Sequence, residues 1–428
     1  MNRLHRSIGL TMLTTILLIT AGCDMLTQQT NRKEKANITS NPIEGQYIVV
    51  LKEDDSFTTS HSKINYSKRT MADNGVNRTA VIEAATDLMT EAKINPEKSA
   101  LHYYSHAIKG FSVKANAAQL EALKNDPRVK YVEPDYRVSL PPLEVHDAPL
   151  PPGLLHADKS KQKSVEGQDP KTKAMADYFP WGVSRVGGAV DASGYYAWVI
   201  DTGIDLDHSD LNVNTYYSAS FVDSEPSPDD YNGHGTHVAG TIGAVYNGYG
   251  VVGVAANTTL FAVKVLDGNG SGSYSDVIAG LDYVARYAYP GEVANLSLGG
   301  PPSDALDDAV RNCADQGVLV TLAAGNDGDN ANNYSPARVE YPNVWTVSAI
   351  DINDDFASFS NYGNPPIEWA SPGVGVWSTW KGDTYKKISG TSMASPHVGG
   401  LLTTGSITAD GYANGDPDGN PDPISYRQ

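Results

Sequence analysis

A buried β-strand that ends in a carboxylate is predicted by residues 198–205, WVIDTGID. Three apolar residues lead into Asp201, and threonine and glycine follow where the chain must turn. A carboxylate loses favourable hydration on burial unless other groups donate hydrogen bonds to it. Asp201 therefore either caps its own turn or serves a side chain from elsewhere in the sequence.

The same kind of apolar run recurs further along the chain, and helical patterns separate the runs. Strands this continuous in apolar character are typical of a parallel sheet covered by helices on both faces. In such sheets, functional side chains gather at the carboxyl ends of the strands. We therefore expect an α/β domain with strands at 197–200, 260–266, 293–298, 318–323 and 344–350, and helices at 236–246, 274–287 and 303–316.

A histidine flanked by glycines follows in residues 232–240, NGHGTHVAG. Without bulky neighbours, the imidazole of His234 is accessible from a cleft. His237 lies three residues later, but no H-E-x-x-H pattern or third ligand indicates a metal site. We expect His237 to be a buried, hydrogen-bonded histidine on the helix.

Two further segments carry polar groups at the ends of predicted elements. Residues 390–398, GTSMASPHV, place Ser392 near a helix N-terminus, where free N–H groups favour negative charge. A lone serine there could be a simple N-cap, but Asp201 and His234 upstream favour a nucleophile. Residues 323–328, AAGNDG, supply the side-chain amide of Asn326 after a buried strand.

These four segments together resemble the subtilase family of serine proteases (S8 type), in its order Asp, then His, then Ser. Within the family, NYSPA (residues 333–337) and SFSNYG (residues 358–363) are most similar to the proteinase K and aqualysin branch. The resemblance implies a subtilisin-like three-layer α/β domain with a mostly parallel sheet over residues 178–428.

The resemblance also implies a role for each polar group. Ser392 would be the nucleophile, His234 the general base and then acid, and Asp201 the group that orients the imidazole. Asn326 and the N–H of Ser392 would form the oxyanion hole. The implied reaction is hydrolysis of peptide bonds through an acyl-enzyme.

A peptide-binding surface follows from the same resemblance. Backbone groups beside glycines can pair with an extended peptide and leave room for large side chains. We expect cleavage after apolar or aromatic residues of protein and peptide substrates. The implied surface has an edge strand with Gly270, Ser271, Gly272 and Tyr274, one wall with Ser297, Leu298, Gly299 and Gly300, and another wall with Ala323, Ala324 and Gly325.

A structural calcium ion is a further expectation from the proteinase K branch. The matching ligands are the carbonyls of Pro342 and Val344 and the carboxylate of Glu368. The branch has Asp where this chain has Glu368, and the loop here is one residue longer at Asn364-Pro365-Pro366. Oxygen ligands suit Ca²⁺; the alternative is that Glu368 is ordinary surface charge.

A second domain is predicted for residues 45–138, where strands interleave with two helices as in a small α+β, ferredoxin-like sandwich. GQYIVVL (45–51), IKGF (108–111) and YVEPD (131–135) resemble the I9-type propeptide of subtilases. It would act as an intramolecular inhibitor and chaperone, removed by autoprocessing. The alternative is an unrelated accessory domain. Residues 139–177, rich in Pro, Lys and Asp, are expected to be a linker, and maturation is expected to cut within it or just before it.

The N-terminus predicts export. Two arginines precede an apolar run at residues 8–19, which is too short for the ~20 residues that span a bilayer. Residues 1–23 therefore form a signal peptide, and 24–44 a polar tether. Ala-Gly-Cys before residue 24 resembles a lipobox, so Cys23 is either a lipidated membrane anchor or incidental to a secretory leader. Either way the protein is extracytoplasmic, in the cell envelope or secreted.

Charge is concentrated in the larger domain. From residue 178 onward there are nine Lys and Arg against 29 Asp and Glu, although the whole chain carries a net −18. This acidity disfavours nucleic acid as a partner. We expect a monomer, and we expect the acidic tail DPDGNPD (416–422) to be disordered.

Two other classes of protein remain as alternatives. One is a catalytically inactive surface-binding protein on a subtilase frame. The other is an α/β-hydrolase esterase, which would need the order Ser, acid, His and a G-x-S-x-G elbow. The chain has GTSMA at 390–394 with its histidine upstream.

Overall fold

The computed structural model describes residues 42–58, 76–142, 144–151, 154 and 177–428. The expected signal peptide with Cys23, nearly all of the tether and most of the linker lie outside these residues. Within them, no helix has the length and apolar character required to cross a membrane.

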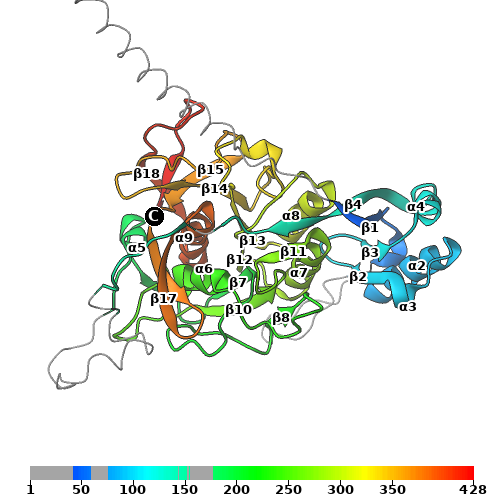
Figure 1. Cartoon of the computed structure of the whole chain (residues 1–428), viewed down its shortest axis with the longest axis horizontal. Coiled ribbons are helices and arrows are strands. Elements are labelled where there is room, and N and C mark those ends of the chain that lie inside the picture. The colour runs from blue at the N-terminus through cyan, green and yellow to red at the C-terminus, as the bar shows by residue number, and fades with distance from the viewer. Residues whose placement is uncertain (1–41, 59–75, 143, 152–153, 155–176) are drawn as a thin grey trace, which may run out of the picture. The chain divides into compact units, whose positions relative to one another are not determined.

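A nine-stranded sheet forms the centre of the larger domain (Figure 1). Its neighbouring strands pair in parallel except for the last hairpin, as the apolar runs predicted. The strands, in spatial order, are β18 (Ile407–Tyr412), β19 (Pro423–Arg427), β15 (Ile367–Pro372), β14 (Val344–Ile350), β13 (Leu319–Ala323), β12 (Val293–Leu296), β7 (Tyr196–Asp201), β10 (Thr259–Lys264) and β8 (Ala219–Ser220).

Helices cover both faces of this sheet (Figure 1). In β7, Trp198 and Ile200 pack with α7 (Tyr274–Tyr287) and α8 (Asp304–Asp315), whereas Ala197 and Val199 pack against α6 (His234–Gly243). Alternate residues of a strand point to opposite faces, so one apolar run serves two cores. The three-layer α/β architecture is therefore confirmed.

The smaller domain is an antiparallel sheet with helices, as expected. It contains a strand at 100–104, and its last strand runs from Val129 to Ser139, one residue beyond the predicted domain boundary at 138. Its strand order is β4-β1-β3-β2, and β11 of the larger domain joins at the β4 edge. The elements are β1 (Pro42–Leu51), η1 (Asp55–Phe57), α2 (Arg78–Glu91), α3 (Pro96–Ser99), β2 (Ala100–Tyr104), β3 (Gly110–Lys114), α4 (Ala117–Lys124) and β4 (Val129–Ser139).

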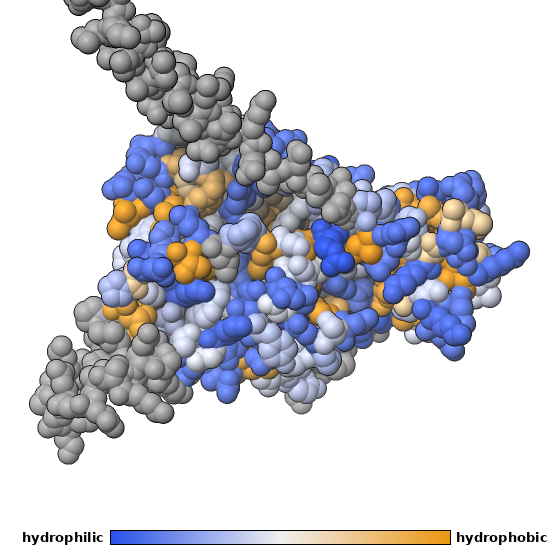
Figure 2. All heavy atoms as spheres, in the orientation of Figure 1, coloured by the Kyte–Doolittle hydropathy of each residue, from blue (hydrophilic) through white to orange (hydrophobic). Residues whose placement is uncertain are grey.

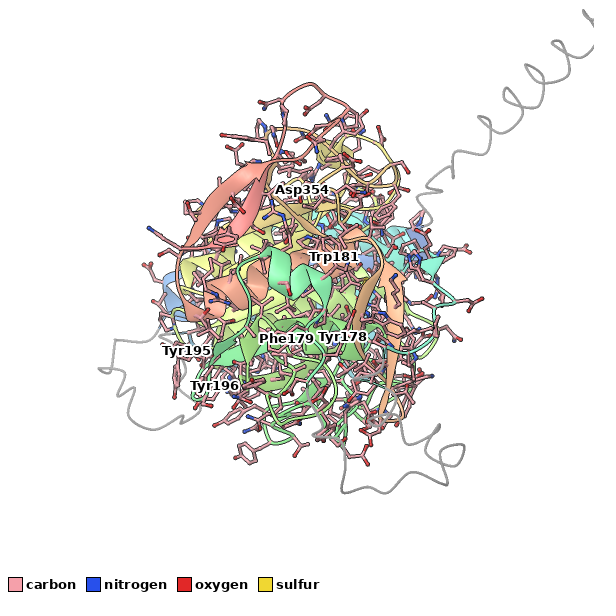
Figure 3. The ribbon with its side chains drawn as sticks, turned by 90° about the vertical axis from the view of Figure 1, so that its left-hand side faces the viewer. Tyr178, Phe179, Trp181, Tyr195, Tyr196 and Asp354 are labelled. Atoms are coloured by element: carbon pink, nitrogen blue, oxygen red, sulfur yellow. The ribbon has the colours of Figure 1, made fainter. Side chains whose placement is uncertain are left out.

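The first residues of the larger domain form an aromatic segment at its surface (Figure 3). The Tyr178 N–H donates to the Gly250 carbonyl at 2.7 Å. Trp181 opens α5 (Trp181–Arg185), and its indole N–H donates to a backbone carbonyl. Arg185 closes the helix with an ion pair to Asp354 at 2.7 Å. These contacts fix the start of the domain.

The remaining strands lie outside the central sheet. Two of them, β16 and β17, form a hairpin that carries the chain into α9, and β17 also pairs with β5 from the predicted linker. The elements are β5 (Glu144–Val145), β6 (Val190–Asp191), β9 (Ala255–Ala256), β11 (Ser271–Ser273), η3 (Ala331–Asn333), β16 (Val376–Trp380), β17 (Thr384–Ser389) and α9 (Thr391–Thr404).

The expectation of a disordered acidic tail was wrong. Residues 416–422 form the turn of the β18–β19 hairpin, and β19 pairs with the central sheet at Ala370 and Ile424. Ile424 and Asp422 are fully buried. Composition suggested disorder, but two strands outside the acidic turn supply the apolar contacts. Elsewhere hydrophilic side chains dominate the visible face of the described surface (Figure 2).

Candidate active site

The predicted carboxylate and imidazole meet at the carboxyl end of β7. Nδ1 of His234 lies 2.8 Å and 3.0 Å from the two carboxylate oxygens of Asp201. The carboxylate can only accept, so Nδ1 carries the proton and Nε2 is left as the basic nitrogen. Both side chains are almost fully buried. In this geometry Asp201 orients the ring.

Glycines allow this contact. Gly233, with φ of +113°, turns the chain into α6, so that His234 is the first residue of the helix. A Cβ at Gly235 would lie 2.1 Å from the Gly203 carbonyl oxygen and 3.2 Å from Oδ1 of Asp201. The backbone of α6 therefore approaches the end of β7 more closely than any side chain would permit.

Two buried charged residues that sequence reasoning did not single out hold the surrounding loops. Asp230 accepts hydrogen bonds from the N–H groups of Gly233 and Thr236 at 2.8 Å and 2.9 Å. Lys264, fully buried at the end of β10, donates to the Thr202 carbonyl at 2.7 Å. A buried charge needs such partners. Lys264, inside an otherwise apolar strand, was a weak signal in the sequence, whereas Asp230 lies in a loop and offered none.

Ser392 is the second residue of α9 and is nearly buried. Its Oγ donates to the Ser297 carbonyl at 3.1 Å, and the Ser297 hydroxyl donates to the Ser392 carbonyl at 2.9 Å. Among the described residues, no hydrogen bond joins Ser392 to His234. The two still belong to neighbouring helices, because Met393 packs in one apolar cluster with Val238 of α6.

Asn326 is held beside Ser392 in one orientation. Its Oδ1 accepts hydrogen bonds from the N–H and the hydroxyl of Thr391, both at 2.9 Å. This fixes the amide, so Nδ2 is the group left to donate. A Cβ at Gly390 would lie 3.5 Å from Nδ2 of Asn326 and 3.7 Å from the Ser392 nitrogen. Two donors therefore border one space that glycine leaves open.

Two other histidines are structural. Nε2 of His237 donates to the carbonyls of Val376 and Lys386 at 3.1 Å and 3.2 Å, and Nδ1 of His397 donates to the Met393 carbonyl at 2.8 Å. Burial lowers the pKa of His237 to about 3 and that of His397 to about 4. Both are neutral at physiological pH and brace α6 and α9.

The predicted edge strand is occupied by the smaller domain. In β11, Ser271 and Gly272 pair antiparallel with Ser139 and Val138 of β4, and the N–H of Leu140 donates to the Gly270 carbonyl at 2.9 Å. Tyr274 begins α7 and is fully buried, with its hydroxyl donating to the Pro301 carbonyl at 2.7 Å. An extended segment thus binds where a substrate is expected.

The two predicted walls follow neighbouring strands. Ser297, Leu298, Gly299 and Gly300 come after β12, and Ala323, Ala324 and Gly325 end β13 and follow it. Both walls border the start of α9, since Ser297 bonds to Ser392 and the Gly325 N–H donates to the Thr391 hydroxyl at 3.1 Å. A Cβ at Gly325 would lie 2.3 Å from the Asn361 amide.

The expected calcium ligands lie near the β14–β15 pair. Glu368 occupies an irregularity in the register, and its Oε2 accepts the Thr346 N–H at 2.7 Å. Burial raises the pKa of Glu368 to about 8. The described residues contain no group of three or more His, Cys, Asp or Glu side chains in metal-binding geometry. A site here would need backbone carbonyls, such as those of Pro342 and Val344, to complete it. The half-buried carboxylate fits a cation.

Two acids of the smaller domain cap helices of the larger one. Glu133 accepts the N–H groups of Asp304 and Ala305 at the start of α8, at 3.1 Å and 3.3 Å. Asp135 accepts the N–H and the hydroxyl of Ser275 at the start of α7, at 3.1 Å and 2.6 Å. Carboxylates are favoured at helix N-termini, so this contact is electrostatically matched.

Comparison with known proteins agrees with this architecture. The model of the Subtilase family matches residues 193–404, and that of Peptidase inhibitor I9 matches residues 46–141. An alkaline protease of Alkalihalobacillus alcalophilus is 44% identical over 62% of this chain and 67% of the relative. The M-protease of Shouchella clausii (strain KSM-K16) is 39% identical over 75% of each chain.

Two further matches point the same way. Subtilisin Savinase of Lederbergia lenta is 48% identical over 53% of this chain and 83% of its own. The crystal structure of a cold adapted subtilisin-like serine proteinase, 38% identical, superposes with a TM-score of 0.53 over 58% of this chain and 98% of that one. The chain belongs to the subtilase family and is a subtilisin-like serine protease with an I9 inhibitor domain.

Proposed function

We propose that the protein is the precursor of an autoprocessed serine endopeptidase in which Asp201, His234 and Ser392 form the catalytic triad. The observation that carries this proposal is the buried bond from Nδ1 of His234 to Asp201, together with a serine at the N-terminus of the neighbouring helix α9. A relay of this kind needs the imidazole between carboxylate and hydroxyl. The family assignment supports the same roles.

In the proposed reaction, Nε2 of His234 takes the proton of the Ser392 hydroxyl as Oγ bonds to the substrate carbonyl carbon. The carbonyl oxygen becomes an oxyanion, which accepts hydrogen bonds from Nδ2 of Asn326 and the N–H of Ser392. His234 then returns the proton to the leaving amine. Water hydrolyses the acyl-enzyme by the same steps. Asp201 stabilises the protonated ring throughout.

The precursor requires one rearrangement before this can occur. The Ser392 hydroxyl donates to the Ser297 carbonyl, so it must exchange this acceptor for Nε2 of His234. Catalytic hydrogen bonds are often incomplete without substrate. A substrate N–H that bonds to the Ser297 carbonyl would displace the hydroxyl and direct it to the imidazole.

We extend the proposal to specificity and maturation. The glycine-lined walls near Ser297 and Gly325 favour large apolar or aromatic side chains before the cleaved bond. The β4–β11 pairing supports an inhibitor that binds like a substrate until it is removed. In this proposal the mature enzyme is a monomer of the proteinase K and aqualysin branch.

Calcium and location complete the proposal. Pro342, Val344 and Glu368 would hold a structural Ca²⁺, whose charge offsets the buried carboxylate. Residues 1–23 would export the chain, and Cys23 would anchor it by lipid in the cell envelope or leave with the leader in a secreted form. Both N-terminal features rest on the sequence alone.

The test is covalent labelling with a fluorophosphonate, which reacts with an activated serine. Wild-type protein should be labelled at Ser392 after processing, and Ser392→Ala should remain an unprocessed, folded precursor without peptidase activity. Ser395→Ala is a control of similar burial and should keep activity. A processed wild-type protein that is neither labelled nor active would instead be the surface-binding protein without catalysis.

A further inference from the structure

Lys264 is a buried cation beside the carboxylate of the proposed triad. It ends β10, the strand next to β7 in the central sheet, and it is paired in register with Asp201 (Figure 1). Alternate residues of both strands pack against α6, so the two side chains lie on the same side of the sheet. The side chain of Lys264 is fully buried. A buried charge is costly unless polar partners surround it, so the partners of this ammonium group show what it holds in place.

Two of these partners are backbone carbonyls next to Asp201. Nζ of Lys264 donates to the carbonyls of Thr202 and Leu266 at 2.7 Å and 2.8 Å. The N–H of Thr202 in turn donates to Oδ1 of Asp201 at 2.7 Å. The N–H of Leu266 donates to the Asp201 carbonyl at 3.2 Å. The ammonium group therefore fixes the residue whose N–H helps to orient the carboxylate.

Glu225 is the third partner, and it has two contacts. Its Oε2 lies 2.9 Å from Nζ of Lys264 in an ion pair, and the side chain of Glu225 is only 22% exposed. Its Oε1 accepts the N–H of Gly268 at 2.9 Å. The ring of Tyr231 lies 5.5 Å from the same ammonium group, a distance at which the ring attracts a cation. One carboxylate thus neutralises Lys264 and also holds the turn of residues 267–270, which leads into β11.

The same turn is connected to the imidazole. The Gly268 carbonyl accepts Nδ2 of Asn232 at 3.2 Å, and Oδ1 of Asn232 accepts the N–H of His234 at 3.2 Å. From Gly268, one series of contacts therefore reaches His234, and another reaches Asp201 through Glu225 and the lysine. Both begin beside β11, the edge strand that pairs with the inhibitor domain.

We infer that Glu225 and Lys264 are positioning residues of the catalytic site, which hold Asp201 through Thr202 and join it to the turn before the peptide-binding edge. This inference rests on the proposed function and adds two residues that need not touch the substrate. Glu225 also cancels the positive charge of Lys264. Without Glu225, that charge would lie uncompensated near His234 and would oppose protonation of the imidazole.

The effect on pH dependence follows from the charges around the start of α6, which packs against β7, β10, β16 and α9. His237 of the same helix and His397 of α9 are neutral at physiological pH. The ionised groups on these elements and the adjoining loops are Asp201, Asp205, Asp229, Asp230, Lys264, Lys381 and Lys386. Glu225→Gln leaves all of them in place and removes one negative charge, so the protonated imidazole becomes less stable. The acidic limb of kcat/KM, which reports the base of the free enzyme, should then move to lower pH.

The test uses enzyme matured from the full-length chain, with a chromogenic peptide for kcat and KM and the rate of fluorophosphonate labelling at Ser392 as a second measure of the neutral imidazole. Glu225→Gln should lower kcat about tenfold with KM close to wild type, and the acidic limb of both measurements should move to lower pH. Glu225→Asp keeps the charge on a shorter side chain, so it should lower kcat while the limb stays at its wild-type position. Asp223→Asn, an exposed acid of the same loop, is the matched control and should behave as wild type.

Three outcomes would overturn the inference: an acidic limb of Glu225→Gln that coincides with wild type, an equal shift in Asp223→Asn, or a wild-type kcat in Glu225→Asp. The last of these decides the matter even where Glu225→Gln does not mature. Absence of labelling in every form, wild type included, would instead overturn the proposed function.

Discussion

The substitution Gly235→Ala tests whether close backbone packing positions the imidazole. The added Cβ would lie 2.1 Å from the Gly203 carbonyl oxygen, whereas ordinary contact begins at 3.4 Å. The start of α6 must therefore move by about 1.3 Å relative to the end of β7, and a misplacement of about 1 Å can reduce a rate about 10²-fold. Overpacking of this kind also costs about 1–3 kcal/mol of stability.

We expect Gly235→Ala to lower kcat on a chromogenic peptide about 10²-fold with little change in KM, because the peptide-binding strands lie elsewhere. Autoprocessing should slow in parallel. Gly399→Ala is the matched control, since its nearest neighbour would be 3.4 Å from the new Cβ and alanine favours the helix. A kcat for Gly235→Ala within threefold of wild type, in a folded protein, would refute this account of how His234 is positioned.

Three further predictions follow from the site and its surroundings. Asn326→Ala should lower kcat by about 10²–10³-fold with KM nearly unchanged, a range taken from subtilisin itself. If KM instead rises by the same factor by which kcat falls, Asn326 has a role in substrate binding. Glu133→Ala should weaken inhibition by the released inhibitor domain about fivefold or more, since a helix cap contributes about 1 kcal/mol or more, whereas the exposed Glu97→Ala should leave the inhibition constant unchanged. Burial raises the pKa of Glu368 from 4.5 to about 8, so the folded state binds this proton more tightly than the unfolded state, and in EDTA the melting temperature of the Ser392→Ala precursor should fall as pH rises from 5 to 8. Calcium should reverse that fall at pH 8, and Glu368→Gln should remove both effects; a calcium response that survives Glu368→Gln would place the ion elsewhere.

The strands that position the site could be predicted because burial on both faces leaves a clear mark in sequence. β7, β10 and β13 are nearly continuous apolar runs, and each ends close to a functional group. The glycines around His234 were interpreted as access to the imidazole from a cleft, whereas in the structure His234 is buried and Gly235 allows α6 to pack closely against Gly203. By contrast, Lys264 and Asp230 gave no comparable signal, because a buried charge is identified by its partners, and those come from distant segments.

For the acidic tail, the sequence suggested too little structure. Residues 416–422 suggested disorder by composition, but β18 and β19 on either side pair with each other and with β15. The predicted linker also has more structure than its composition suggested. Proline and charge removed any periodicity there, yet Leu154 is fully buried against the larger domain. Local patterns cannot report a contact that depends on a surface built by other parts of the chain.

The sequence by itself determined the chemistry that is available: one carboxylate, one imidazole, one hydroxyl and one amide, each at the end of a predicted strand or the start of a helix. Only the tertiary structure decided how these groups are oriented. His234 bonds to both oxygens of Asp201, whereas Ser392 bonds to Ser297 in the precursor. The physical reason is that hydrogen bonds act over about 3 Å, and at that scale the packing of α6 and α9 against the ends of the strands sets each direction.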